Sequence, residues 1–194
     1  EECYRLGLYV LDEFDSYQFQ IDTANGARLI GEMVRRDVNH PCIIAWDNGN
    51  EGGANGNLDG GNPGSTNYFA LYDVQNRLVI RPNQGGAVFN GIVTDHYELY
   101  NSVTNYLRAG ATSVFMPTEM LHGLYDGGIG ACLSEIWGAF RSSTNGGGMF
   151  LWAFLDEGIT NALIGGLDCK GQSAPDGVVG PFRQKEAGYY ACKS

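Results

Sequence analysis

The chain has 194 residues, of which 43% are hydrophobic and 12% aromatic, a composition that supports a folded globular core. It carries 22 acidic and 12 basic side chains, and the resulting formal charge of −10 disfavours binding to nucleic acid or to an anionic membrane surface. A neutral or uncharged partner therefore suits the chain better.

Neither a membrane span nor a signal peptide can be recognised. The longest apolar runs are shorter than the roughly 18 residues that a membrane span requires, and the first residues lack a basic start and a small-residue cleavage pattern. The compartment therefore stays unknown, with a periplasmic or secreted location favoured over a cytoplasmic one.

The five cysteines include no C-x-x-C pair, which indicates neither a zinc site nor a disulfide-dense scaffold. We expect Cys42 and Cys132 to be small core residues, because free cysteine is often buried. A bridge among Cys3, Cys169 and Cys192 is left open.

Six apolar segments predict buried strands. Apolar runs of this kind are typical of parallel strands that are covered on both faces. The segments are residues 6–14, 42–46, 77–80, 91–94, 113–116 and 148–155.

Helical patterns lie between these segments. Apolar residues recur at helical spacing over residues 27–38, and Pro41 then stops that helix. A second helix is predicted over residues 129–141, and a weaker pattern covers residues 98–108, with Gly110 placed to cap it.

Strands alternating with helices predict an α/β fold, either an open sheet or a barrel. Acidic residues follow five of the predicted strands, at Asp12, Glu51, Asp95, Glu119 and Asp156. A (β/α)8 TIM barrel builds its site from many strand ends at one face, whereas an open sheet concentrates its site at one switch point. We therefore predict a (β/α)8 TIM barrel, formed as one domain over residues 1–194 without a boundary or repeat.

The number of strands is low for this fold. About six are predicted, and a full barrel needs eight. Either the chain is the C-terminal part of a larger barrel, or two strands are not recognisable in the sequence.

Glu51 and Glu119 each come just beyond an apolar strand, and they form the candidate catalytic pair. Glycoside hydrolysis requires two carboxylates, one to protonate the leaving oxygen and one to act at the anomeric carbon. Judged from the residues alone, structural or metal-binding carboxylates are the alternative.

Residues 35–51, RRDVNHPCIIAWDNGNE, resemble the signature of glycoside hydrolase family 2, whose pattern R-D-x-N-H-P-S-[VI]-x-x-W-S-x-G-N-E ends on the acid/base glutamate. The one notable departure near its end is Asp47, in place of the usual serine. The matching residues are Arg36, Asp37, Asn39, His40, Pro41, Trp46, Gly49, Asn50 and Glu51.

Other segments resemble the β-galactosidase branch of this family in the same order along the chain. They are CYRLGLYVLDE near the start, PTEMLHG, EIWGAF, GGGMFLWAFLDEG and the closing DGVVGPFRQKEAGYYACK. The resemblance implies that this chain begins at the third barrel strand. It also implies that the first two strands and the upstream jelly-roll and immunoglobulin-like domains belong to a longer protein. A homo-oligomer is left open.

The resemblance implies that Glu51 is the general acid/base and Glu119 the nucleophile of a retaining mechanism, with carboxyl groups about 5–5.5 Å apart. It places Asn50 at the sugar 2-hydroxyl and Tyr97 against the nucleophile, to which its phenol can donate a hydrogen bond. The alternatives are a satisfied turn amide for Asn50 and the nearby Tyr100 in the role of Tyr97.

Two further residues are expected to contact the sugar. His122, three residues after Glu119, resembles a sugar-contacting histidine of the branch, and Trp152 resembles the aromatic floor under the sugar. A structural histidine and a core tryptophan are the alternative interpretations.

The implied function is a retaining exo-β-glycosidase that removes terminal β-linked sugars, with β-galactosides favoured. The asparagine-x-lysine pattern of β-glucuronidases is absent, which argues against a uronic acid. After His122 the chain departs from the branch, so strict galactose specificity stays open. Asp59 is the one obvious hard ligand in the loop after Glu51, and we predict no required metal or cofactor. The alternative is an inactive carbohydrate-binding or structural remnant.

Overall fold

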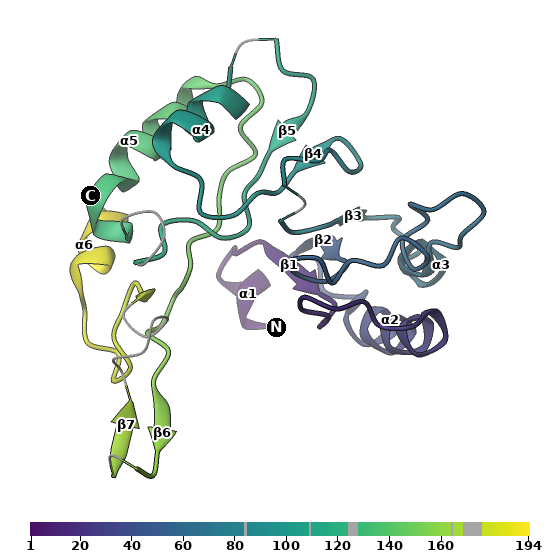
Figure 1. The fold of residues 1–194 in the computed structure, drawn as a ribbon, viewed down its shortest axis with the longest axis horizontal. Coiled ribbons are helices and arrows are strands. Elements are labelled where there is room, and N and C mark those ends of the chain that lie inside the picture. The colour runs from purple at the N-terminus through teal and green to yellow at the C-terminus, as the bar shows by residue number, and fades with distance from the viewer. Residues whose placement is uncertain (84, 109, 124–127, 164, 169–175) are drawn as a thin grey trace. The chain divides into compact units, whose positions relative to one another are not determined.

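A computed structural model describes residues 1–83, 85–108, 110–123, 128–163, 165–168 and 176–194. The chain divides into two compact units, Glu1–Thr94 and Asp95–Ser194, and each has its own helices and strands (Figure 1). Among the described residues, no helix is both long enough and apolar enough to traverse a membrane.

A parallel sheet of three strands organises the first unit. Its strands are β1 (Val10–Glu13), β2 (Ile43–Asp47) and β3 (Leu78–Ile80), with β2 in the middle. In register, Asp12 lies opposite Trp46, which in turn lies opposite Val79. The strand predicted at residues 42–46 is thus confirmed as the central strand, and the prediction at residues 77–80 is confirmed by β3.

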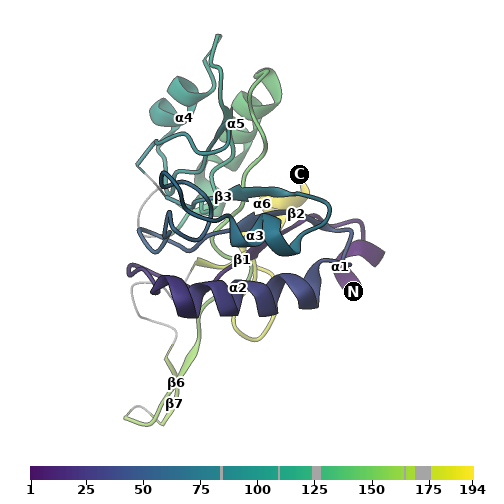
Figure 2. The ribbon, with the colours of Figure 1, turned by 90° about the vertical axis from the view of Figure 1, so that its right-hand side faces the viewer.

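Helix α2 (Thr23–Asp37) connects β1 to β2, as a parallel pair requires. The helix starts earlier than the predicted residue 27 because the Asp22 carboxylate accepts hydrogen bonds from the backbone N–H groups of Ala24 and Asn25, which caps its first turn. α2 lies next to the short helix α3 (Tyr68–Tyr72), and both flank the sheet (Figure 2).

The core of the first unit is centred on Trp46, which is fully buried among side chains of α2, α3 and the sheet, including Ile30, Val34 and Phe69. Its indole N–H donates to the carboxylate of Asp73 at 2.8 Å. The central strand is therefore stabilised both by the burial of the Trp46 ring and by the hydrogen bond from its indole to Asp73, which we call the polar anchor of the strand.

Asp73 is that polar anchor. Its Oδ1 lies 3.0 Å from the Arg77 guanidinium, and it also accepts hydrogen bonds from the backbone N–H groups of Gln75 and Arg77. Burial alone would raise the pKa of Asp73, but the hydrogen bonds from Trp46, Arg77 and Gln75 hold it below its ordinary value. The Asp73 carboxylate is fully buried, and Arg77 nearly so.

The start of the chain differs from the expectation of a strand over residues 6–14. Only Val10–Glu13 form a strand, and the short helix α1 (Glu2–Arg5) precedes it. Gly7 has a φ of +73°, a left-handed conformation that redirects the backbone after α1, and Leu8 and Tyr9 are exposed. The apolar run at residues 6–14 therefore did not predict burial along its whole length.

The first unit closes with β4 (Ile92–Val93), which lies within the predicted strand at residues 91–94.

In the second unit the helices are longer than the strands. Its elements are α4 (Tyr100–Tyr106), β5 (Val114–Phe115), α5 (Ile129–Ser142), the antiparallel pair β6 (Ile159–Asn161) and β7 (Gly166–Asp168), and α6 (Ala187–Lys193). α5 confirms the prediction at residues 129–141 and packs against both α4 and α6 (Figure 1). α4 is shorter than the predicted 98–108, since Leu107 already caps it.

An aromatic stack joins α4, β5 and α5. The Phe115 ring lies 4.5 Å from that of Tyr106 and 5.6 Å from that of Phe140, measured between centroids, and both pairs are nearly parallel. Phe115 is 1% exposed. The stack anchors the strand that leads toward Glu119.

The strand predicted over residues 148–155 is wrong as a continuous strand. The backbone N–H of Trp152 donates to Met120 on one side, whereas the N–H of Ala153 donates to the carbonyl of Asp176 on the other. Only isolated parallel bridges result, at Leu151 and Leu155. The segment changes partner halfway along, so it forms no regular ladder with either neighbour.

Among the described residues, the strands form small sheets and no closed barrel. The prediction of an α/β fold with parallel strands is confirmed in the first unit, where strands and helices alternate. In the second unit the parallel pairing is reduced to single bridges, such as His96 with Glu119.

Cys42 is buried, as predicted, but Cys132 is only partly buried. Cys3 and Cys192 are both free thiols. Cys169, the third cysteine of the bridge that was left open, lies outside the described residues.

Candidate active site

Glu51 follows the central strand β2 after a sharp change of direction. Gly49 has a φ of +76° and Glu51 a φ of +46°, so the backbone turns out of the sheet within four residues of Asp47. The backbone N–H of Asn50 donates to the carbonyl of Ser16 at 2.7 Å. Gln18 Nε2 lies 3.4 Å from Glu51 Oε2. The segment at residues 16–18 thus holds both Asn50 and Glu51.

Gly53 allows this segment to approach closely. A Cβ on Gly53 would lie 1.7 Å from the carbonyl oxygen of Ser16, and the Ser16 hydroxyl donates to the Gly53 carbonyl at 2.6 Å. Since the obstacle is backbone, no side-chain rotation can relieve the clash. The glycine after the signature is therefore required by packing.

Replacement of Gly53 by alanine is expected to lower the free energy of unfolding by about 1–3 kcal/mol, because the methyl group forces the Glu51 turn away from Ser16. Urea unfolding of the variant measures this change. Gly138→Ala is the matched control, because a Cβ there meets open space in the middle of α5 and the variant should be no less stable than wild type. Equal stability of Gly53→Ala and wild type would contradict the packing role.

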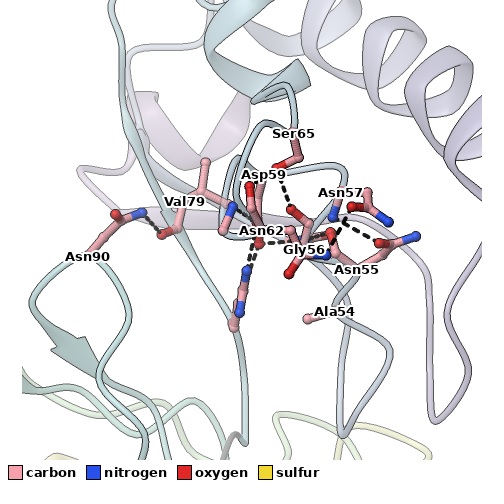
Figure 3. Close-up of polar contacts among 12 residues, drawn as sticks. Ala54, Asn55, Gly56, Asn57, Asp59, Asn62, Ser65, Val79 and Asn90 are labelled. Carbon is pink, nitrogen blue, oxygen red and sulfur yellow. Dashed lines mark hydrogen bonds and ion pairs between the residues drawn. The ribbon is translucent and has the colours of Figure 1, made fainter.

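The glycine-rich loop after Glu51 is ordered around the buried carboxylate of Asp59 (Figure 3). Arg81 donates to both of its oxygens at 2.6 and 2.7 Å. Asn48, just beyond β2, donates to Asp59 Oδ2 at 2.6 Å, and the backbone N–H of Gly61 donates to Oδ1 at 2.9 Å. Asp59 therefore serves as an ion-paired anchor between the loop and the end of the central strand.

Asparagine and serine side chains complete the same loop (Figure 3). Asn55 Oδ1 accepts from the backbone N–H of Asn57, and the Ser65 hydroxyl donates to the carbonyl of Gly56. Such short polar side chains stabilise turns through local hydrogen bonds to the backbone. This explains how a segment so rich in glycine keeps a defined course.

Glu119 lies in the second unit and is 6% exposed. The Tyr97 hydroxyl donates a hydrogen bond to Glu119 Oε2, and the Tyr97 backbone N–H donates to the Glu119 carbonyl at 2.8 Å. His96 Nδ1 lies 3.6 Å from the same carboxylate oxygen. A phenol donor and an imidazole thus fix the orientation of a buried carboxylate.

His122 extends this cluster. Its ring meets that of Tyr97 edge to face, with centroids 5.2 Å apart, and its Nε2 lies 3.1 Å from Asp176 Oδ2. Burial lowers the pKa of His122, which favours the neutral imidazole. Burial, reinforced by the charges of Glu157 and Asp156, raises the pKa of Asp176 to about 6.

A backbone hydrogen bond places Trp152 next to the segment that carries Glu119. The Trp152 N–H donates at 2.9 Å to the carbonyl of Met120, the residue after Glu119. Its side chain is half-buried. The second unit therefore gathers four of the predicted site residues: Glu119, Tyr97, His122 and Trp152. Glu51 and Asn50, the other two, belong to the first unit.

Asp176 was not singled out by the sequence, although it opens the closing segment DGVVGPFR. The available signal was the Asp-Gly pair before an apolar stretch, since such a pair marks a tight turn at a strand end. Ser16 carried no signal, because its role depends on a backbone approach across the first unit.

Two solved structures have a fold similar to that of this chain. The beta-galacturonidase from Eisenbergiella tayi, solved bound to galacturonate, superposes with a TM-score of 0.67 at 16% identity, over 99% of this chain and 41% of that chain. The Bifidobacterium dentium beta-glucuronidase, solved with coumarin-3-O-glucuronide, gives 0.65 at 18% identity, over 99% and 38%. The chain therefore shares the fold of the matched part of these two structures.

The sequence identifies the family to which the chain belongs. Residues 1–162 match the family described as "Glycosyl hydrolases family 2, TIM barrel domain". The chain belongs to glycosyl hydrolase family 2, which confirms the resemblance seen in its motifs.

Curated relatives are much longer than this chain. The beta-galactosidase of Vibrio cholerae is 31% identical over 190 residues, covering 82% of this chain and 17% of the relative. That of Oenococcus oeni is 27% identical over 199 residues, covering 87% and 18%. The chain thus spans less than a fifth of the length of these relatives.

Proposed function

We propose that residues 1–194 are part of the TIM-barrel catalytic domain of a retaining exo-β-glycosidase that releases terminal β-linked sugars, with β-galactosides favoured. Family membership supports glycosidase chemistry, and the curated relatives named above support the sugar. The activity is that of the whole protein, and its substrate is a carbohydrate.

In this proposal Glu119 is the nucleophile. The observation that carries the assignment is the hydrogen bond from the Tyr97 hydroxyl to Glu119 Oε2. A donor on one carboxylate oxygen holds the group in a single rotamer and leaves the other oxygen to attack the anomeric carbon. The low exposure of Glu119 keeps water from competing for its charge.

Glu51 is proposed as the general acid/base, which protonates the leaving oxygen and later activates water. Its support is the turn after β2, where Ser16 and Gly53 fix the backbone that carries it. Asn50 is proposed to hold the sugar 2-hydroxyl, while His122 and Trp152 line the sugar site.

A mechanism-based trap tests the proposal. Incubation with a 2-deoxy-2-fluoro-β-galactoside that carries a good leaving group should add one fluorosugar to the protein, because the fluorine slows hydrolysis of the covalent intermediate. Intact-mass measurement followed by peptide mapping should locate the adduct on Glu119. An adduct on another residue would overturn the nucleophile assignment, and the absence of an adduct from a folded protein would favour the inactive remnant.

A further inference from the structure

Residues 49–54, here called the Glu51 loop, have a backbone conformation that the loop does not favour by itself. Gly49, Glu51 and Gly52 have φ values of +76°, +46° and +92°. Such left-handed values are disfavoured for a glutamate and persist only where the surroundings impose them. The position of the Glu51 carboxyl group therefore depends on the contacts that hold the two ends of this loop.

The Asn48 side chain joins these two ends. Its Nδ2 donates to the carbonyl of Asn55 at 3.1 Å, which links the residue before the loop to the residue after it. The same nitrogen donates to Asp59 Oδ2 at 2.6 Å. Asn48 is fully buried and Asn55 nearly so. A donor that loses its acceptor in such a position is left unsatisfied at a considerable cost, so the side chain of Asn48 is held in one orientation.

Asp59 fixes that orientation from a second strand (Figure 3). Its carboxylate is fully buried and accepts from Asn48 and Arg81 Nε on Oδ2, and from the Gly61 N–H and Arg81 Nη2 on Oδ1. Arg81 directly follows β3, and its Cζ lies 3.9 Å from the centroid of the Phe89 ring. The carboxylate thus connects Asn48 to the end of the neighbouring strand.

These four donors require a carboxylate at position 59. An asparagine would turn its NH2 group toward two N–H donors in either orientation, because Arg81 donates to both oxygens. It would also leave the partly buried guanidinium of Arg81 without its counter-charge. Asp59→Asn therefore disturbs the support of Asn48 while it keeps the size of the side chain at position 59.

We propose that Asp59 is a positioning residue for general-acid catalysis: through Asn48 it holds the Glu51 loop where the Glu51 carboxyl group can protonate the leaving oxygen. The inference rests on the proposed function, which assigns Glu51 as the acid/base. In the first chemical step the Glu119 carboxylate bonds to the anomeric carbon, the bond from that carbon to the leaving oxygen breaks, and the Glu51 proton passes to that oxygen. A misplacement by about 1 Å can slow such a step by about 10²-fold.

Leaving groups of different acidity test this role. The 2,4-dinitrophenolate ion leaves without a proton, whereas phenol requires one from the acid. Asp59→Asn in the whole protein is therefore compared with wild type on 2,4-dinitrophenyl β-galactoside and phenyl β-galactoside, with kcat/KM measured for each. Asn48→Ala is the second variant, because it removes the donor to Asn55 and leaves the ion pair of Asp59 with Arg81 in place.

Asp73→Asn is the matched control. Asp73 is also a fully buried carboxylate of the first unit that is paired with an arginine, Arg77, but it accepts from Trp46 and not from Asn48. Its replacement should lower stability without changing the dependence of the rate on the leaving group. The unfolding midpoints of the three variants define a temperature at which each is folded and assayed.

Asp59→Asn and Asn48→Ala should each lower kcat/KM for the phenyl substrate by about 10²-fold, but for the dinitrophenyl substrate by less than about threefold. The control should change the ratio of the two kcat/KM values by less than about twofold. A residue that only stabilised the fold would lower both values by the same factor. Where Asp59→Asn does not fold at any assay temperature, Asn48→Ala decides by itself.

Equal losses on both substrates, or no loss on either, would overturn the inference. A selective loss in Asp59→Asn without one in folded Asn48→Ala would contradict the connection through Asn48, and a selective loss in the control would show that the effect is not particular to Asp59. The fluorosugar trap separates these outcomes from failure of the proposed function. An adduct on Glu119 together with unselective losses removes only the inference, whereas a wild type that forms no adduct and hydrolyses neither substrate removes both.

Discussion

Glu119→Gln is expected to reduce turnover of an aryl β-galactoside by about 10³-fold or more, because the amide keeps the size of the side chain but cannot attack the anomeric carbon as an anion. The Tyr97 hydroxyl can still donate to the amide oxygen, so the packing around residue 119 should persist. Release of the aryl alcohol measures the rate, and an unchanged unfolding midpoint shows that the loss is chemical.

Glu119→Gly extends this test to the stereochemistry. Removal of the carboxylate leaves space in which azide can stand in for the nucleophile, and its attack from that face expels the leaving group and yields a glycosyl azide of inverted configuration. Nuclear magnetic resonance of the product identifies the configuration at the anomeric carbon.

The control for both variants is Glu135→Gln, an exposed carboxylate on α5 that should retain wild-type turnover. Wild-type rates in Glu119→Gln, or a glycosyl azide of retained configuration from Glu119→Gly, would show that another residue attacks the sugar.

The central strand and the long helix α2 of the first unit could be predicted because local signals and packing agree there, whereas the short helices α1 and α3 were missed. The apolar run before Trp46 forms the central strand, and the apolar stripe with Ile30 and Val34 forms the buried face of α2. The prediction was wrong where an apolar run is not buried along its whole length, as at Leu8 and Tyr9. Hydrophobicity alone cannot distinguish these cases, since many apolar side chains remain at protein surfaces.

The second unit was harder to predict because its backbone pairing depends on segments far apart in the sequence. The backbone N–H of Trp152 donates to Met120, whereas that of Ala153 donates to Asp176. The apolar pattern of residues 148–155 contains no information about this change of hydrogen-bonding partner. The same long-range pairing brings Asp176 to His122, which is why this contact could not be predicted from the sequence. The motif around Glu119, in contrast, could be recognised because its residues are adjacent in the chain.

Asp73→Ala should have the largest effect on stability, with an expected loss of about 3–5 kcal/mol in the free energy of unfolding at pH 7.5. The substitution leaves the indole N–H of Trp46 and the nearly buried guanidinium of Arg77 without their shared acceptor. Urea unfolding, followed by the fluorescence of the buried tryptophan, measures the loss.

The stabilising contribution of Asp73 should depend on pH in a definite direction. Because the pKa of Asp73 is held below its ordinary value of 3.8, its contribution to stability is fully present above that value and disappears as the pH falls through the lower folded-state pKa. The difference in the free energy of unfolding between wild type and Asp73→Ala should therefore shrink on acidification below about pH 4.

Arg28→Ala is the matched control in the same unit. It breaks the exposed pair with Glu32, whose partners are more than half exposed, and should change stability by less than about 0.5 kcal/mol. Comparable small losses for Asp73→Ala and Arg28→Ala would mean that apolar burial of Trp46 alone holds the central strand, and that the strand carrying Glu51 does not depend on its polar anchor.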